Sequence, residues 1–242
     1  MVWWHEEVSP GIWVGFTGAD AGNLAFHVGG DAGEVRANRA ALAVELGLDT
    51  APAAARLQFM DQVHGNDVAV VSAGDFAPEA GPTADAMVSL GEPLAVLVAD
   101  CVPVVLVGAR ADHTPVLAVA HAGRPGVATS VVPRTVAAMR GQGAVSIRAW
   151  LGPSVCGACY EVPAALRDEV AAVAPASWST TSWGTPALDL PAAVLAQLAA
   201  AGVAAQRIKA CTLQERGLFS HRRFGREGGS QGRFAGVVHA RH

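Results

Sequence analysis

Three short segments of the chain carry side chains that could together hold a metal ion. Their sequences are Gln-Val-His-Gly, Asp-Cys-Val-Pro and Ala-His-Ala-Gly, and they contain His64, Cys101 and His121. Two imidazoles and one thiolate suit zinc, and three protein ligands leave one coordination position for water or substrate, as in catalytic zinc sites. The intervals between the ligands are too long for a zinc finger or ribbon, so the fold must bring them together.

Two other interpretations of these residues stay open. Cys101 could instead be a nucleophile that His64 or His121 activates. A non-enzymatic protein could hold zinc in a closed site with four protein ligands, in which Cys156 or Cys159 would be the fourth. The wide spacing and the lack of a second Cys-x-x-Cys pair argue against this closed site.

Asp100 interrupts an apolar run just before Cys101, and a buried carboxylate needs a partner. It could accept a hydrogen bond from a metal-bound histidine, as such imidazoles usually require. It could equally be a strand-end residue that bonds the backbone. We count Asp100 with Cys101, His64 and His121 as candidate catalytic residues.

Arginines near these segments suggest an anion site. Arg124 follows His121 between two glycines, where a helix is expected to begin, and a helix N-terminus of this kind can hold an anion. Five more arginines crowd the C-terminal part of the chain and predict either a phosphate-binding site or a solvated loop. They are Arg216, Arg222, Arg223, Arg226 and Arg233.

Composition limits the function classes. A net charge of −4 and a pI of about 6.0 argue against a nucleic-acid-binding protein. No apolar run is long enough for a membrane-spanning helix, and the N-terminal residues do not resemble a secretory signal, so we expect a cytoplasmic protein. Scattered cysteines fit a reducing compartment. The pair Cys156 and Cys159 is weak evidence for redox or metal chemistry, and Cys211 is interpreted as a small buried hydrophobic residue.

The hydrophobic pattern predicts one domain over residues 1–242, with nine to eleven strands, four helices and no repeat or linker. The expected fold class is α/β (α+β), a sandwich of mixed sheets flanked by helices. Asp31 is expected to cap the first helix, and Gly47 to end it. Helices are predicted over 31–47, 127–140, 163–173 and 191–201. Strands are predicted over 12–17, 56–60, 67–72, 86–90, 94–99, 102–107, 116–120, 147–151, 207–210 and 234–239.

Several motifs in order resemble one known family. Besides the three ligand segments they include Ala84-Asp85-Ala86, Cys159-Tyr160-Glu161-Val162 and the C-terminal Phe-Ser-His-Arg-Arg and Gly-Arg-Phe-Ala-Gly-Val-Val. On these residues the chain resembles the laccase-domain family, also called multicopper polyphenol oxidase-like or peptidoglycan editing factor. The likeness spans nearly the whole chain.

The resemblance implies a zinc ion on His64, Cys101 and His121, with copper as the alternative metal. It implies purine nucleoside phosphorylase activity, in which adenosine, inosine, guanosine or methylthioadenosine reacts with phosphate, and adenosine deamination as a companion activity. The partners would be small molecules, and the protein a monomer or small homo-oligomer. The family's other names imply cell-wall precursor editing or copper-dependent phenol oxidation. Three clustered ligands are too few for a multicopper oxidase.

The chain departs from the family pattern where phosphate or substrate would bind. The segment after Thr17 lacks an arginine that the family usually has, and Arg124 is displaced by one position. Asn23 matches the end of the same loop. The substrate-binding residues that we expect are therefore Asn23, Arg124, Arg222 and Arg223.

Overall fold

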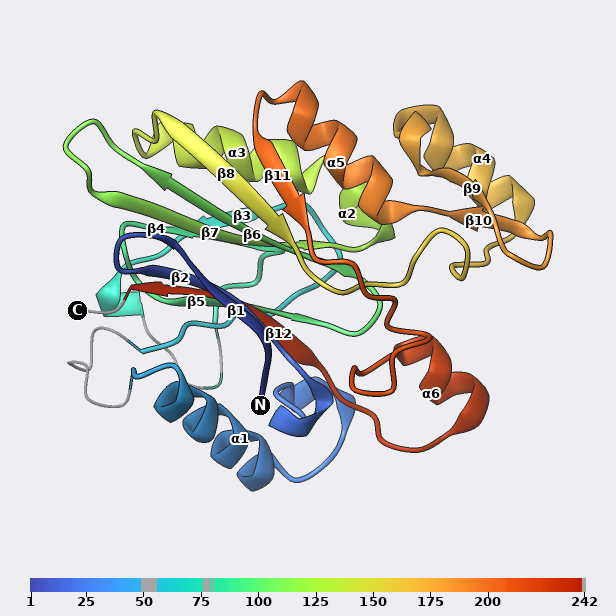
Figure 1. Cartoon of the computed structure of the whole chain (residues 1–242), viewed down its shortest axis with the longest axis horizontal. Helices are drawn as coiled ribbons and strands as arrows, with labels where there is room; N and C mark the ends of the chain where they lie inside the picture. Colours follow the sequence, from blue (N-terminus) through green and yellow to red (C-terminus); the bar gives the residue numbers. More distant parts are fainter. Residues whose placement is uncertain (49–55, 76–78, 80, 241–242) are drawn as a thin grey trace.

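Two β-sheets stack face to face, and helices cover their outer faces (Figure 1). The computed structural model describes residues 1–48, 56–75, 79 and 81–240. Within these ranges the protein has the predicted class, a mixed α+β sandwich flanked by helices. Three buried clusters of side chains lie between the successive layers.

The larger sheet has six strands and the smaller has four. The larger has the order β11 (Ala204–Arg207), β8 (Ser146–Leu151), β6 (Val102–Ala109), β7 (Pro115–Ala122), β4 (Ala86–Ser89) and β3 (Val68–Val70). The smaller has the order β1 (Val2–Ser9), β2 (Ile12–Thr17), β12 (Phe234–Ala240) and β5 (Leu94–Val98). A separate hairpin joins β9 (Trp178–Thr180) to β10 (Pro186–Leu188).

Most helices lie on the side of the larger sheet. They are α2 (Arg124–Ala128), α3 (Val131–Gly141), α4 (Ala164–Val173) and α5 (Leu190–Ala200). The smaller sheet is covered by α1 (Ala32–Glu45), and α6 (His221–Glu227) lies at one end of the sandwich (Figure 1). Short 3-10 turns occur at Ala19–Ala21, Phe26–Val28, Ala73–Asp75 and Pro175–Ser177.

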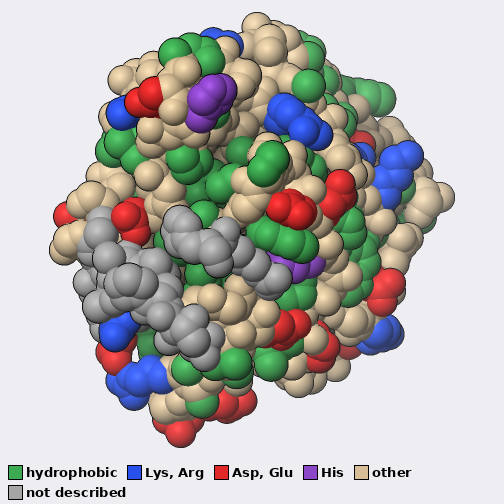
Figure 2. Space-filling model, turned by 60° about the vertical axis from the view of Figure 1, so that its left-hand side comes forward, with side chains coloured by type: hydrophobic (Ala, Val, Ile, Leu, Met, Phe, Trp, Pro, Cys, Tyr) green, Lys and Arg blue, Asp and Glu red, His purple; other side chains and the backbone are tan. Residues whose placement is uncertain are grey.

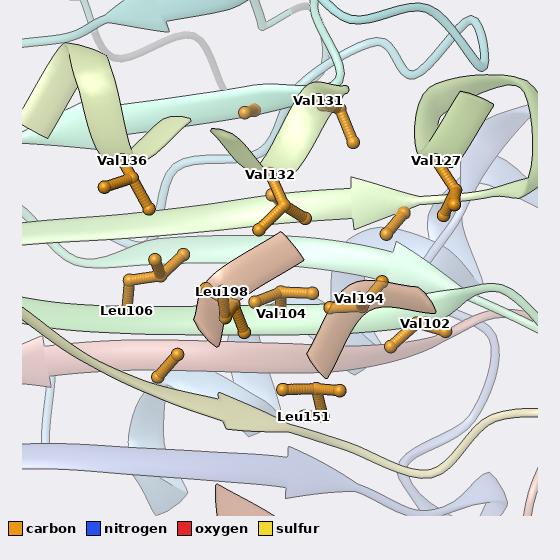
Figure 3. Close-up of a cluster of buried hydrophobic side chains, with 14 of the residues drawn as sticks. Val102, Val104, Leu106, Val127, Val131, Val132, Val136, Leu151, Val194 and Leu198 are labelled. Atoms are coloured by element: carbon orange, nitrogen blue, oxygen red, sulfur yellow. The ribbon is translucent and has the colours of Figure 1, made fainter. Parts of the chain in front are cut away.

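Burial on both faces explains the continuous apolar runs of the sequence. Successive side chains of a strand point to opposite faces, so Val104 of β6 packs toward the helices while Val105 packs between the sheets. Figure 3 shows the helix-facing cluster, in which Val136 of α3 and Leu198 of α5 lie over Leu106 of β6. This layering holds the strand ends, where the candidate ligands lie, in fixed positions.

Several predicted elements are confirmed. The cap at Asp31 accepts a hydrogen bond from the Gly33 amide, and Asp189 caps α5 in the same way. Three expectations were wrong. The strand expected over 56–60 makes one isolated bridge, Gln58 with Leu94. The helix expected over 127–140 is two helices, because Ser130 has φ +67°. The strand expected over 207–210 ends at Arg207, since its parallel pairing with β8 ends there.

Other elements were not predicted from the pattern. β1, the β9–β10 hairpin and α6 are short or partly exposed, so their hydrophobic periodicity is weak. None of the helices in the described ranges has the length and hydrophobicity needed to cross a lipid bilayer. On the face drawn in Figure 2, the lysine and arginine side chains of the described residues are scattered rather than gathered in one basic patch.

Candidate functional site

Antiparallel pairing of β6 with β7 brings two of the predicted ligands together. Cys101 comes directly before β6, and His121 is the second-last residue of β7, where it pairs with Pro103. His64 lies in the turn that precedes β3, on the far side of β4. Its φ of +61° is unusual for a residue with a side chain, and such a conformation costs about 1–3 kcal/mol.

Asp85 holds this arrangement. Its side chain is fully buried just before β4, and its Oδ1 atom lies 2.8 Å from Nδ1 of His121. The same carboxylate accepts hydrogen bonds from the amides of Val63, His64 and Gly65, at 3.2, 2.9 and 2.6 Å. These three bonds stabilise the left-handed turn at His64. Asp85 thus positions both histidines, the role that we had considered for Asp100.

The donor set fits a zinc ion. One ligand atom from each of His64, Cys101 and His121 lies within 4.8 Å of the other two. Sγ of Cys101 is 3.9 Å from Nε2 of His64, and tetrahedral zinc would separate such atoms by about 3.6 Å. Because Nδ1 of His121 faces Asp85, its Nε2 atom is left for a metal.

Charge interactions within the site shift three pKa values. Burial opposes the thiolate of Cys101, but the charge of His121 and hydrogen bonds from His121 and His64 outweigh it and lower the pKa to about 6. Burial likewise opposes a charged His121, but the Cys101 thiolate and Asp85 raise its pKa to about 9. Burial would raise the pKa of Asp85, yet His121 and the Gly65 amide bring it below its usual value. Without metal, the site therefore favours a thiolate–imidazolium pair.

The three ligands open into a cavity of about 520 Å³. Three arginines line it, Arg124, Arg222 and Arg233, together with Asp100 and Tyr160. The guanidinium carbon of Arg222 lies 4.3 Å from the centre of the Tyr160 ring. Burial lowers the pKa of Arg233, although the negative charges of Cys101 and Asp100 act to raise it. A cavity with several cations beside a candidate metal site is suited to an anionic substrate.

Of the two roles left open for Asp100, a hydrogen bond to a candidate ligand histidine is not found, because both of its carboxylate oxygens bond elsewhere. Its Oδ1 atom accepts from the hydroxyl of Thr212 at 2.6 Å, and its Oδ2 atom accepts from the amide of Arg222 at 2.8 Å. The alternative interpretation, a strand-end residue that bonds the backbone, describes it better. Asp100 fixes the start of α6 and therefore the position of Arg222 at the cavity.

Two expected substrate contacts lie elsewhere. Arg223 donates to the carbonyls of Thr212, Leu213, Glu215 and Leu218, and so braces a loop. Asn23 does not line this cavity. Its side chain bonds the backbone of Ala25 and accepts from the amide of Arg233 at 3.1 Å. Asn23 therefore positions an arginine of the cavity rather than lining the cavity itself.

Sequence reasoning named Arg233 only within the group of C-terminal arginines, missed Asp85 and Tyr160 as site residues, and left His27 and His221 as ordinary histidines. All but Asp85 line the cavity. Burial and the charge of Arg233 lower the pKa of His27. A charged residue directly before a largely apolar strand was a signal for Asp85, because only a buried partner would justify it. Residues such as His27 carry no such signal.

The remaining C-terminal arginines and the other cysteines lie outside this site. Arg216 pairs with Glu227 and Arg226 with Glu161 on the surface. Cys156 and Cys159 belong to a different cluster, so the closed site with one of them as fourth ligand is wrong. Cys211 joins that cluster, so it is more than the small buried hydrophobic residue that the sequence indicated.

Comparisons with known proteins show the family of this chain. The model of the family described as multi-copper polyphenol oxidoreductase laccase matches residues 5–241. A protein of Streptomyces coelicolor named purine nucleoside phosphorylase is 48% identical over 221 residues, which are 89% of this chain and 86% of that protein. Another of that name, from Streptomyces griseus, is 46% identical over 233 residues, 93% of this chain and 90% of that protein.

Solved structures share the fold over nearly the full length. The crystal structure of YlmD from Geobacillus stearothermophilus matches with a TM-score of 0.80 and 30% identity, over 96% of this chain and 93% of that one. A Neisseria meningitidis protein of the DUF152 family matches with a TM-score of 0.78 and 28% identity, over 97% and 96%.

Proposed function

This chain belongs to the multi-copper polyphenol oxidoreductase laccase family, and within it we propose that the protein is a zinc-dependent purine nucleoside phosphorylase. Relatives at 48% and 46% identity are named purine nucleoside phosphorylase. One observation of the structure carries the proposal: the cavity of about 520 Å³ joins the His64, Cys101 and His121 cluster to several arginines. This combination suits phosphorolysis, because one substrate is an anion and the other has a polar base.

The arginines would bind phosphate. Arg124, Arg222 and Arg233 lie on the cavity wall, and each can donate to phosphate oxygens. A phosphate oxygen so placed attacks the anomeric carbon of the sugar. The bond from that carbon to the base nitrogen breaks, its electron pair stays on the base, and the base then takes a proton. That proton comes from solvent in the cavity, because the Asp100 carboxylate accepts hydrogen bonds at both of its oxygens and has no proton to donate.

His64, Cys101 and His121 would hold zinc, with copper as the alternative ion. When bound, such an ion acts as a Lewis acid on the substrate and activates water, which is the chemistry that the companion adenosine deamination requires. The chain's contribution is preorganisation. Asp85 fixes the tautomer of His121 and the turn at His64, so little reorganisation accompanies binding.

Chromatography of purified protein with adenosine or inosine tests the proposal. Free adenine or hypoxanthine should appear only when phosphate is present, and should vanish in Cys101→Ala. Inosine formed from adenosine would establish the deaminase activity. If zinc-loaded protein releases no base with phosphate, the phosphorylase proposal fails.

A cysteine-type hydrolase that acts on peptidoglycan precursors is the second candidate. The geometry in its favour is the contact of Cys101 with His64, whose Nε2 atom lies 3.9 Å from Sγ. Although burial opposes the thiolate, the two histidines lower the pKa of the thiol to about 6, and thiolates are the reactive form of nucleophilic cysteines. This candidate requires cleavage of an amide bond that continues after a chelator has removed the metal. Loss of all turnover on chelation, with recovery when zinc is restored, would exclude it.

A further inference from the structure

The three cysteines outside the cavity come together because two strands run in parallel. β8 and β11 pair in parallel over Arg148–Leu151 and Ala204–Arg207, so the chain leaves both at the same end of the sheet (Figure 1). Cys156 and Cys159 follow β8, and Cys211 follows β11. A parallel bridge between Ser154 and Cys211 keeps the two loops side by side.

The sulfur atoms of this cluster converge on one point. The Sγ atoms of Cys156, Cys159 and Cys211 all lie within 4.8 Å of one another. The amides of Cys159 and Tyr160 bond the carbonyl of Cys156 at 2.9 and 3.0 Å, so a tight turn brings the first two together. Cys211 approaches from the other loop, and its Sγ atom lies 3.5 Å from the amide nitrogen of Cys156. All three are free thiols.

We propose that Cys156, Cys159 and Cys211 form a second metal site, for a thiophilic ion of the zinc or copper(I) class. Metal–sulfur bonds of about 2.3 Å place three thiolates about 4 Å apart around one ion, which is compatible with the observed cluster. Thiolates select these ions over hard cations. Binding releases the thiol protons to solvent and changes no oxidation state. A disulfide would join only two of the three sulfurs and would need an external oxidant.

The ion would tie together two parts of the cavity wall. Thr212, next to Cys211, donates to Asp100, and the amide of Val155 donates to the carbonyl of Asp100 at 3.0 Å. Tyr160, next to Cys159, lines the cavity. The role of the ion would therefore be structural, and we expect its binding to raise the melting temperature of the protein.

Counting bound metal tests this site separately from the first. Protein stripped with a chelator under reducing conditions is titrated with Co²⁺ or Zn²⁺, and bound metal is measured after gel filtration. Cys211→Ser should bind about one equivalent less than wild type, whatever the first site does. Cys101→Ser should keep the second site. The thiolate-to-cobalt absorption per bound ion should be about three times higher in Cys101→Ser than in Cys211→Ser. The site that remains in Cys101→Ser has three thiolates, whereas the site that remains in Cys211→Ser has one.

Cys156→Ser guards against misfolding of the first variant, because it removes another sulfur of the same cluster from the other loop. It should show the same loss of metal with unchanged far-ultraviolet circular dichroism. Equal metal content in wild type and in both serine variants would overturn the proposal. So would a disulfide among these cysteines in the isolated protein, found by intact mass before and after reduction.

Discussion

The residue on which the candidate metal site most depends is Asp85. Asp85→Asn keeps the shape of the side chain but removes the charge that His121 and three backbone amides share. We expect the zinc affinity to fall roughly 10- to 100-fold and the free energy of unfolding to fall by about 3 kcal/mol. Competition with a chromophoric chelator and urea denaturation measure the two effects. Asp67→Asn, on an exposed side chain, is the matched control and should change neither.

The thiol of Cys101 should react at unusually low pH in metal-free protein. Its pKa of about 6 means that the thiolate is present at neutral pH and is lost as the pH falls through 6. The rate of alkylation by iodoacetamide should therefore be half-maximal near pH 6, whereas an ordinary cysteine has a pKa of about 8.5. Peptide mass spectrometry measures this. Cys159, whose burial raises its pKa to about 12, should stay unmodified, and a Cys101 midpoint above pH 8 would contradict the charge pairing.

Two adjacent arginines should behave differently. Arg222→Ala removes a cation from the cavity, so we expect the KM for phosphate to rise about tenfold or more with an unchanged melting temperature. Arg223→Ala removes a cation that bonds four carbonyls and should lower the melting temperature. Steady-state kinetics and thermal unfolding of both variants check this. The reverse pattern would mean that Arg223, not Arg222, contacts substrate.

At the scale of elements, the close approach of the β7–α2 junction to the ligands makes a small residue necessary at Gly123. A Cβ atom there would lie 2.9 Å from Cδ2 of His64 and 3.2 Å from Sγ of Cys101. Its φ of −72° suits alanine, so backbone strain is not the reason. Gly123→Ala should lower kcat/KM roughly tenfold or more by displacing the ligands, while the fold persists.

Gly141→Ala, at the end of α3, is the matched control, because a Cβ atom there would meet no neighbour within 4 Å. Metal affinity and kcat/KM of both variants are measured together. Equal activity of the two variants would show that the His64 and Cys101 side chains move aside without consequence.

At the scale of the whole molecule, the layered core should determine stability without entering the chemistry. Leu198 is fully buried between α5 and the larger sheet (Figure 3). Leu198→Ala should lower the free energy of unfolding by about 2–5 kcal/mol, with little change in kcat at 25 °C. Urea denaturation and kinetics measure the two quantities. Val145→Ala, at a side chain that is 74% exposed, should be close to neutral.

The sequence by itself determined the candidate ligand set and most of the framework. Ligand chemistry is a property of residue type, so His64, Cys101 and His121 could be chosen before any contact was known. Caps and buried strands depend on neighbours along the chain, which is why Asp31 and the runs of β6 and β7 were predicted correctly. The family resemblance rested on local motifs in the same way.

Only the tertiary structure decided which residues serve those ligands. Asp85 reaches His121, and Cys211 meets Cys156, through strand register between segments far apart in sequence. The same holds for the arginines: Arg222 faces the cavity while Arg223, one residue on, bonds a loop. Local pattern carries no information about such pairs, because the energy that fixes them comes from contacts that exist only after the sheets have packed.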